Sequence, residues 1–165
     1  MFKLKVCIVP RRKHICRLNQ ADASVSRAIW TLYQSAYQSE AELLGVEDFA
    51  PLNRSCEEIQ TTPSAFNGFF EIDSLAAVSE AHTDGTCLSI DGFAVYPRFY
   101  RKGIGSELLR YILDESSCRS AVVETAAANE PAICFYARFG FTEIDRWETA
   151  EGIQLVRLGA NLPSD

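Results

Sequence analysis

Residues 93–106 read Phe93-Ala-Val-Tyr-Pro-Arg-Phe-Tyr-Arg-Lys-Gly-Ile-Gly-Ser106. An apolar run ends at Pro97, a short polar turn follows, and Gly103 and Gly105 open a strongly helical segment. The first N–H groups of a helix lack partners within the helix, and the helix dipole adds partial positive charge there. Because glycine has no Cβ, an anion can approach the backbone closely at such a turn. The stretch therefore predicts a site for a phosphorylated ligand.

Three interpretations of this turn compete. A Walker loop requires G-x-x-x-x-G-K-[ST], but Lys102 precedes the glycine pair instead of following it. A dinucleotide fingerprint requires G-x-G-x-x-G, and Leu108 occupies the position of the third glycine. The third interpretation is a helix that merely begins after a glycine turn. The turn by itself leaves these alternatives open.

A second stretch predicts a short helix with clear ends. Residues 129–141 read Asn129-Glu-Pro-Ala-Ile-Cys-Phe-Tyr-Ala-Arg-Phe-Gly-Phe141. Asn129 suits the N-cap, and Pro131 suits the first turn because its missing N–H costs nothing there. Gly140 suits the left-handed position that commonly follows a helix. The order of the two stretches narrows the choice of ligand.

Together the two stretches resemble the GNAT acetyltransferase superfamily. The acetyl-CoA loop of that family reads [QR]-x-x-G-x-[GA] after a strand that ends V-x-P. The next signature of the family reads N-x-x-A-x-x-F-Y-x-x-x-G-F. The matching residues here are Val95, Pro97, Gly103, Gly105, Asn129, Ala132, Phe135, Tyr136, Gly140 and Phe141. The first half of the chain resembles the family only in its pattern of elements.

One position departs from the family pattern. The family usually has Gln or Arg three residues before the first glycine, where this chain has Tyr100. In such a loop the pyrophosphate is held mainly by backbone N–H groups, so we expect binding to survive. Arg101 and Lys102 are expected to supply the positive charge.

The composition excludes several classes of function. A chain of 165 residues predicts a single domain over 1–165, with 47% hydrophobic and 23% charged residues as in ordinary soluble proteins. The net charge of −6 disfavours a nucleic-acid partner and is compatible with a cationic amine substrate. No stretch is long enough to span a membrane, so no membrane partner is expected.

The six cysteines do not have the spacing of zinc ligands, and the chain does not look like a disulfide-bonded secreted protein. None belongs to a C-x-x-C pair and no histidine lies at ligand spacing, so we expect no metal site. The first residues lack the long apolar segment of a signal peptide. We therefore expect reduced cysteines packed as small core residues, Cys134 among them, in a cytoplasmic protein.

The predicted elements give an α/β (α+β) fold with a mixed, mostly antiparallel central sheet and helices on both faces, as the resemblance also implies. Strands are expected over 3–9, 14–18, 66–71, 75–81, 87–96, 121–125, 141–149 and 153–158, with a bulge or close approach at Gly92 and a turn over 82–86. Helices are expected from Asp22 or Ser24 to 37, over 40–44, after Ser55, over 103–115 and over 131–139.

The resemblance implies direct transfer of an acetyl group from acetyl-CoA to a primary amine of a small molecule or peptide, in a ternary complex. Tyr136 matches the family's tyrosine that often hydrogen-bonds the departing sulfur. A phenol has a pKa near ~10 and a CoA-like thiol near ~8.5, so the proton transfer costs little in water. The competing interpretation of Tyr136 is a core tyrosine beside Phe135 and Phe139.

The resemblance also implies a set of cofactor-binding residues. The backbone of Phe93 to Val95 is expected to pair with the pantetheine amides as an added strand would. Asn129 is expected to contact the pantetheine arm or to cap its helix. The full set is Phe93, Ala94, Val95, Arg101, Lys102, Gly103, Ile104, Gly105, Ser106, Asn129 and Tyr136.

The general base is less well defined. Asp91 is closest in sequence to the thioester-side backbone, Glu80 is next and Glu71 is a third strand carboxylate, although each also suits a structural role. A water chain is an alternative base, and His82 is expected to be exposed in a turn. Aromatic residues of the first half, either core or substrate wall, are Trp30, Tyr33, Tyr37 and Phe49.

Two other functions compete with the enzyme. A non-catalytic acyl-CoA sensor or partner-binding module could retain the phosphate loop, and the Tyr100 departure favours it. A nucleotide-binding domain of another kind is disfavoured, because neither the Walker nor the dinucleotide pattern is complete. A homodimer is compatible with the resemblance.

Overall fold

The computed structural model describes residues 13–163. The strand expected over 3–9 lies outside these residues. The elements in chain order are β1 (Lys13–Leu18), α1 (Ala23–Leu44), η1 (Ala50–Asn53), α2 (Cys56–Thr61), β2 (Ala65–Glu71), β3 (Ser74–Asp84), β4 (Cys87–Val95), η2 (Pro97–Phe99), α3 (Ile104–Asp114), β5 (Ser120–Ala126), α4 (Glu130–Ala137), β6 (Thr142–Glu148) and β7 (Gln154–Asn161).

The strands form one 7-stranded sheet in the order β1-β2-β3-β4-β5-β7-β6. Every neighbouring pair is antiparallel except β4 and β5, which are parallel. A parallel pair needs a crossover, and α3 supplies it. The prediction of a mixed, mostly antiparallel sheet is confirmed.

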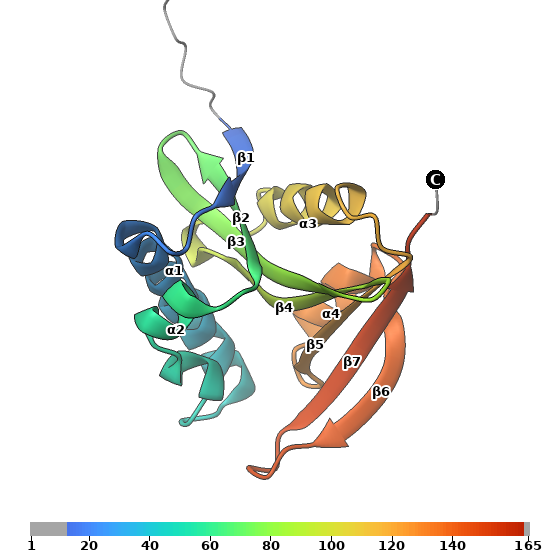
Figure 1. Ribbon diagram of the computed structural model, residues 1–165. Coiled ribbons are helices and arrows are strands. Elements are labelled where there is room, and N and C mark those ends of the chain that lie inside the picture. Colours follow the sequence, from blue (N-terminus) through green and yellow to red (C-terminus); the bar gives the residue numbers. More distant parts are fainter. Residues whose placement is uncertain (1–12, 164–165) are drawn as a thin grey trace, which may run out of the picture.

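Helices cover both faces of the sheet (Figure 1). One apolar cluster joins α1 and α2 to the sheet through residues such as Ile29, Ile59 and Val78. The other joins α3 and α4 to the opposite face through residues such as Leu108 and Tyr136. Side chains alternate between faces along a strand, so each central strand contributes to both clusters.

A β-bulge in β4 changes this alternation next to the site. The register steps from Ala81 opposite Ile90 to Glu80 opposite Gly92, so Asp91 is the extra residue. Ile90 belongs to the α3 side of the core and Ala94 to the α1 side, although they are four residues apart. One inserted residue reverses which face the following side chains occupy.

Gly92 is required at this bulge by a close approach. A Cβ on Gly92 would lie 2.5 Å from the Tyr33 hydroxyl oxygen, nearer than two such atoms can pack. The predicted bulge or close approach at Gly92 is therefore confirmed in both respects, and it brings α1 tightly against β4.

The first helix is longer than predicted. The Asp22 side chain accepts hydrogen bonds from the N–H groups of Ser24 and Val25, which fixes the start of α1. The helix then continues to Leu44 and ends at Gly45, whose φ of 65° is left-handed. The two helices expected over this span are one continuous helix, which carries both Tyr37 and Glu40.

Two smaller expectations were wrong. Strand β3 continues to Asp84, so His82 lies on a strand instead of in a turn. Cys134 is exposed on α4, whereas Cys118 is buried, and the five cysteines of the described residues are all free thiols. Within residues 13–163 no helix is long and apolar enough to cross a membrane.

Candidate active site

Strands β4 and β5 separate in the middle of the sheet. Their parallel pairing runs from Cys87 opposite Ser120 to Ile90 opposite Val123 and has no further partners in the described chain. Beyond the bulge, the edge of β4 that faces β5 is not paired with β5. Two adjoining clefts open at this point, and both are lined by Tyr37, Glu40, Phe93, Asn129, Ala132 and Tyr136.

The first cleft, which we call the α3 cleft, has a volume of about 910 Å³. It is lined by α1, by β4, by the start of α3 and by α4. Gly103 is the N-cap of α3 with a left-handed φ of 79°, and no side chain caps the helix. The first N–H groups of α3 are therefore available to an anion.

Close packing brings α3 up to β4 and α4. A Cβ on Gly105 would lie 3.3 Å from Val95 Cγ2 and 3.6 Å from the ring of Phe135. A side chain larger than methyl at this position must therefore extend past these groups into the cleft. Ser106 and Ile104 also line the α3 cleft, as the sequence predicted for the phosphate loop.

Two arginines line the α3 cleft. Arg101 was predicted, and its φ of 61° places it in the left-handed region just before Gly103. Arg138 follows α4 and was not predicted, although its position two residues after Tyr136 was a usable signal. Lys102 does not line the cleft, and its Nζ lies 4.9 Å from the ring centroid of Phe99. Tyr100 lines the cleft in the place where the family pattern has Gln or Arg.

Tyr136 lies where the two clefts meet. Its side chain is 5% exposed and packs in the core against Phe93, Phe135 and Phe141. Burial, and then the proximity of Tyr37 and Glu40, raises the pKa of the phenol well above its usual range. Tyr136 is thus a core tyrosine that also lines both clefts, and its catalytic role stays a prediction. The phenol stays protonated at neutral pH, and full loss of its proton costs more than it does in water.

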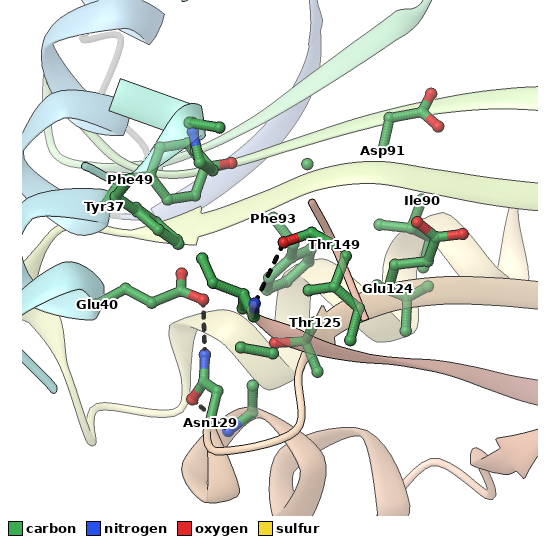
Figure 2. Close-up of a pocket in the computed structure, with 18 of the residues that line it drawn as sticks. Tyr37, Glu40, Phe49, Ile90, Asp91, Phe93, Glu124, Thr125, Asn129 and Thr149 are labelled. Carbon is green, nitrogen blue, oxygen red and sulfur yellow. Dashed lines mark hydrogen bonds between the residues drawn. The ribbon is translucent and has the colours of Figure 1, made fainter. Parts of the chain in front are cut away.

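Asn129 and Glu40 join α4 to α1. The Asn129 Oδ1 accepts from the N–H of Ala132 at 3.2 Å and so caps α4, as predicted. Its Nδ2 donates to Glu40 Oε1 at 2.9 Å (Figure 2). Burial raises the pKa of the Glu40 carboxyl. Glu40 was not predicted as a site residue, because on the sequence it is one polar residue on a helix.

Glu80 occupies a different environment from the one predicted for a base. Its carboxylate forms a two-point ion pair with Arg54, at 2.5 Å and 2.9 Å, and its side chain is 3% exposed. The Tyr33 hydroxyl lies 3.4 Å from the same carboxylate, and Glu80 lines neither cleft. A carboxylate held this way is suited to joining α1 and the segment before α2 to the sheet.

Asp91 lines the second cleft, which we call the hairpin cleft because the β6–β7 hairpin forms one wall. Its Oδ2 lies 2.6 Å from His82 Nδ1, and the Ser64 and Ser89 hydroxyls donate to the same carboxylate. The hydrogen bond to Asp91 is the main cause that raises the pKa of His82. The bulge therefore places Asp91, with these hydrogen-bond partners, in the lining of the cleft.

The hairpin cleft has a volume of about 500 Å³. Tyr37 and Phe49 line it, which is compatible with their interpretation as part of a substrate wall. Figure 2 shows them beside Glu40. Trp30 and Tyr33 instead pack in the core on the α1 side. Glu71 lines neither cleft.

The α3 cleft fits acetyl-CoA. Uncapped N–H groups at the start of α3 and the guanidinium of Arg101 suit a pyrophosphate. The free edge of β4 suits an extended amide chain, and it leads from α3 to Phe93 and Tyr136, where the clefts meet.

The sequence of the described site matches a known family. A sequence model of the acetyltransferase (GNAT) family matches residues 24–141, which include every residue shared by the two clefts. The chain belongs to this family. The match also covers much of the first half of the chain, where the sequence contains neither of the two family motifs.

Two curated relatives match this chain over part of their length. The protein YqkA of Bacillus subtilis is 29% identical over 139 residues, covering 84% of this chain and 40% of that protein. The ribosomal protein bS18-alanine N-acetyltransferase of Salmonella typhimurium is 38% identical over 66 residues, covering 36% of this chain and 45% of that enzyme. The matches span less than half of the length of both relatives.

Solved structures share the fold. The ribosomal-protein-S18-alanine N-acetyltransferase of Escherichia coli superposes with a TM-score of 0.73 at 19% identity, covering 93% of this chain and 96% of that one. The PaiA N-acetyltransferase of Thermoplasma acidophilum, solved in complex with coenzyme A, gives a TM-score of 0.70 at 15% identity, covering 89% and 98%. The predicted GNAT-like fold is confirmed.

Proposed function

We propose that this chain is a single acetyltransferase domain that transfers an acetyl group from acetyl-CoA to a primary amine in a ternary complex. The observation that carries the proposal is the meeting of the two clefts at Tyr136, Phe93 and Glu40. One cleft fits the cosubstrate and the other is open to an acceptor. The name of the Salmonella relative, an alanine N-acetyltransferase, supports an amine acceptor.

The chemistry of this transfer requires few groups from the protein. Acetyl-CoA supplies an acyl group that an amine attacks directly, so no covalent enzyme intermediate is needed. The backbone near Phe93 orients the carbonyl and donates a hydrogen bond as negative charge develops on its oxygen. Tyr136 donates a hydrogen bond to the departing sulfur. Its raised pKa favours this role over complete transfer of the proton.

The acceptor arrives as an ammonium ion, so one proton must leave before its nitrogen can attack. A second proton leaves to solvent as the C–N bond forms, the C–S bond breaks and CoA departs as a thiolate. We assign the first of these protons to Glu40, the only carboxylate of residues 13–163 that lines both clefts. Burial raises its pKa, which makes the carboxylate a better base than an exposed one. Asp91, the base expected from sequence, is assigned to holding the incoming ammonium group, because His82 and two hydroxyls already stabilise its charge.

A non-catalytic acyl-CoA sensor is the second candidate function. Tyr100 favours it, since the loop lacks the usual Gln or Arg at that position. The sensor would bind acetyl-CoA in the α3 cleft without turning it over. It leaves the raised pKa of Glu40 and the open hairpin cleft without a role.

Two measurements test the proposal. Calorimetric titration with acetyl-CoA, with ATP and NAD as controls, should show selective binding of acetyl-CoA. A panel of primary amines should then release free thiol at a rate proportional to enzyme concentration. Binding without thiol release from any amine would favour the sensor, and no binding of acetyl-CoA would overturn both functions.

A further inference from the structure

We infer that the acceptor carries a second positive charge, several bonds from the amine that reacts. The inference rests on the proposed function, because it concerns the acceptor of that same reaction. It names a substrate class, an extended aliphatic amine with at least two cationic groups. The source of such an amine is either a small diamine or a basic peptide.

The hairpin cleft is lined by carboxylates from separate parts of the fold. They come from α1, the loop after α1, β4, β5 and the β6–β7 turn, and they are Glu40, Asp48, Asp91, Glu124 and Glu151. No lysine, arginine or histidine of the described chain lines this cleft. Glu40 is half-buried and the other four are exposed, but all five come from separate segments that meet around one cleft instead of one helix face.

Most of this negative charge is not neutralised within the protein. Asp91 pairs with His82, and Glu124 pairs with Arg157 at 2.6 Å, and both cations lie outside the cleft lining. Between residues 13 and 163, no cationic group lies within 4.0 Å of the other three carboxylates, which are Glu40, Asp48 and Glu151. A cavity with unpaired carboxylates attracts cations and repels anions.

The Tyr136 hydroxyl provides an independent indication of a ligand. Tyr136 is more than nine-tenths buried and lines the cleft, and no hydrogen bond joins its hydroxyl to another residue of 13–163. Within these residues the fully enclosed polar atoms that lack a partner are His14 Nδ1 and Ser79 Oγ, so the Tyr136 hydroxyl opens into the cleft and is available to a bound molecule. It fixes where the reacting end of the acceptor lies.

The carboxylates extend away from that reacting end. Figure 2 shows Glu40 beside Asn129 at one end of the cleft and Asp91 with Glu124 at the other, with Phe93 between them. An amine that reacts near Phe93 therefore has acidic groups beyond it along the cleft. The remaining two carboxylates, Asp48 and Glu151, come from the loops at the cleft margin. A second ammonium group on the acceptor would face at least one of them.

Three acceptors of equal chain length isolate the charge of the tail. Cadaverine, pentylamine and δ-aminovalerate carry a cationic, a neutral and an anionic tail on the same chain. We expect kcat/KM for cadaverine to exceed that for pentylamine by about tenfold, and δ-aminovalerate to be the poorest. The preference should shrink as salt is added. A lysine-rich peptide and a neutral peptide, compared in the same way, distinguish the two sources.

A binding measurement separates this inference from the reaction itself. Cadaverine is titrated calorimetrically into protein saturated with CoA, which cannot acetylate it. The double variant Asp48→Asn, Glu151→Gln should reduce both this affinity and the preference for cadaverine severalfold. The matched control, Asp73→Asn with Glu57→Gln, removes two exposed carboxylates away from the cleft and should change neither.

Each outcome bears on a different claim. Turnover of all three amines with no preference for cadaverine would overturn the inference and leave the acetyltransferase intact. Equal loss of preference in the cleft variant and the control variant would assign the effect to net charge and also overturn it. Acetyl-CoA binding with no thiol release from any amine would contradict the proposed function. In that case absence of cadaverine binding to the CoA complex would remove the inference as well.

Discussion

Asn129 Nδ2 lies 2.9 Å from Glu40 Oε1, and this hydrogen bond joins the helix after β5 to the first helix of the chain. The same asparagine caps α4 through its other amide atom. One side chain thus sets both the start of the helix that carries Tyr136 and the position of the carboxylate that faces it. Both side chains line both clefts, so the hydrogen bond lies where the α3 cleft and the hairpin cleft meet.

Replacing the proposed base should lower turnover and change its pH dependence. In Glu40→Gln we expect kcat to fall by about a hundredfold. The acid limb of the wild-type pH–rate profile, which reports the raised pKa of Glu40, should disappear. Steady-state rates from about pH 5 to pH 9 measure both effects. Glu42→Gln, an exposed carboxylate on the same helix, is the matched control. A wild-type rate in Glu40→Gln would return the role to Asp91 or to water.

Removing the Tyr136 hydroxyl should affect catalysis more than binding. In Tyr136→Phe we expect kcat to fall by roughly tenfold to a hundredfold, because the leaving sulfur loses its hydrogen bond. Acetyl-CoA affinity should change little, since the ring and its packing against Phe93 remain. Single-turnover rates and calorimetry separate the two quantities. Tyr111→Phe, which removes a phenol that lines neither cleft, controls for the loss of a hydroxyl. Unchanged turnover would leave Tyr136 as a core residue only.

A carboxylate in the phosphate loop should block the cosubstrate. In Gly105→Glu the side chain must leave the contact with Val95 and Phe135 and enter the α3 cleft, where it repels a pyrophosphate. We expect acetyl-CoA binding to become undetectable by calorimetry, with the circular dichroism of the fold retained. Gly105→Ala adds only the Cβ at 3.3 Å from Val95 and should keep most of the affinity. Normal binding in Gly105→Glu would show that the loop does not hold the pyrophosphate.

Glu80 should prove structural when it is neutralised. Glu80→Gln leaves Arg54 without its ion-pair partner, and we expect the free energy of unfolding to fall by roughly 2 kcal/mol, less than for a fully buried pair because Arg54 is partly exposed. At temperatures well below the transition, kcat should match the wild type. Urea unfolding and steady-state kinetics on the same samples test this pair of results. A large loss of kcat with unchanged stability would restore Glu80 as the base.

The His82–Asp91 pair should make a small, pH-dependent contribution to stability. Because the folded pKa of His82 is raised by its hydrogen bond to Asp91, the contribution is fully present below the unfolded pKa near ~6.5. It is lost as the pH rises through the higher folded pKa. The stability difference between wild type and His82→Gln, measured by urea unfolding, should therefore decrease as the pH rises through that window. We expect a difference of at most about 1 kcal/mol, since the imidazole is half-exposed. A difference that grows with pH would contradict the assignment.

The sequence by itself determined the parts of this protein that depend on local chemistry. Gly103 opens α3, Asn129 caps α4 and Ser55 forms the capping box of α2, because each acts on backbone groups within a few residues. The alternating and helical periodicities of apolar residues predicted most strands and helices. The polar residues after Tyr37 interrupt this periodicity, so the continuation of α1 was not predicted. These local signals, with the two family motifs, were sufficient for the fold class and for the glycine turn that opens α3, whereas phosphate binding at this turn stays a prediction.

Only the tertiary structure decided the roles of the carboxylates. Glu80 and Arg54 are far apart in sequence, and only the docking of α1 and the segment before α2 on β3 pairs them. The bulge at Asp91 depends on register with β3, and Glu40 reaches the site only because α4 meets α1 at Asn129. Whether a carboxylate is paired, buried or open to a cleft depends on neighbours that the chain brings from elsewhere. For that reason the charge of the hairpin cleft could be recognised only in three dimensions.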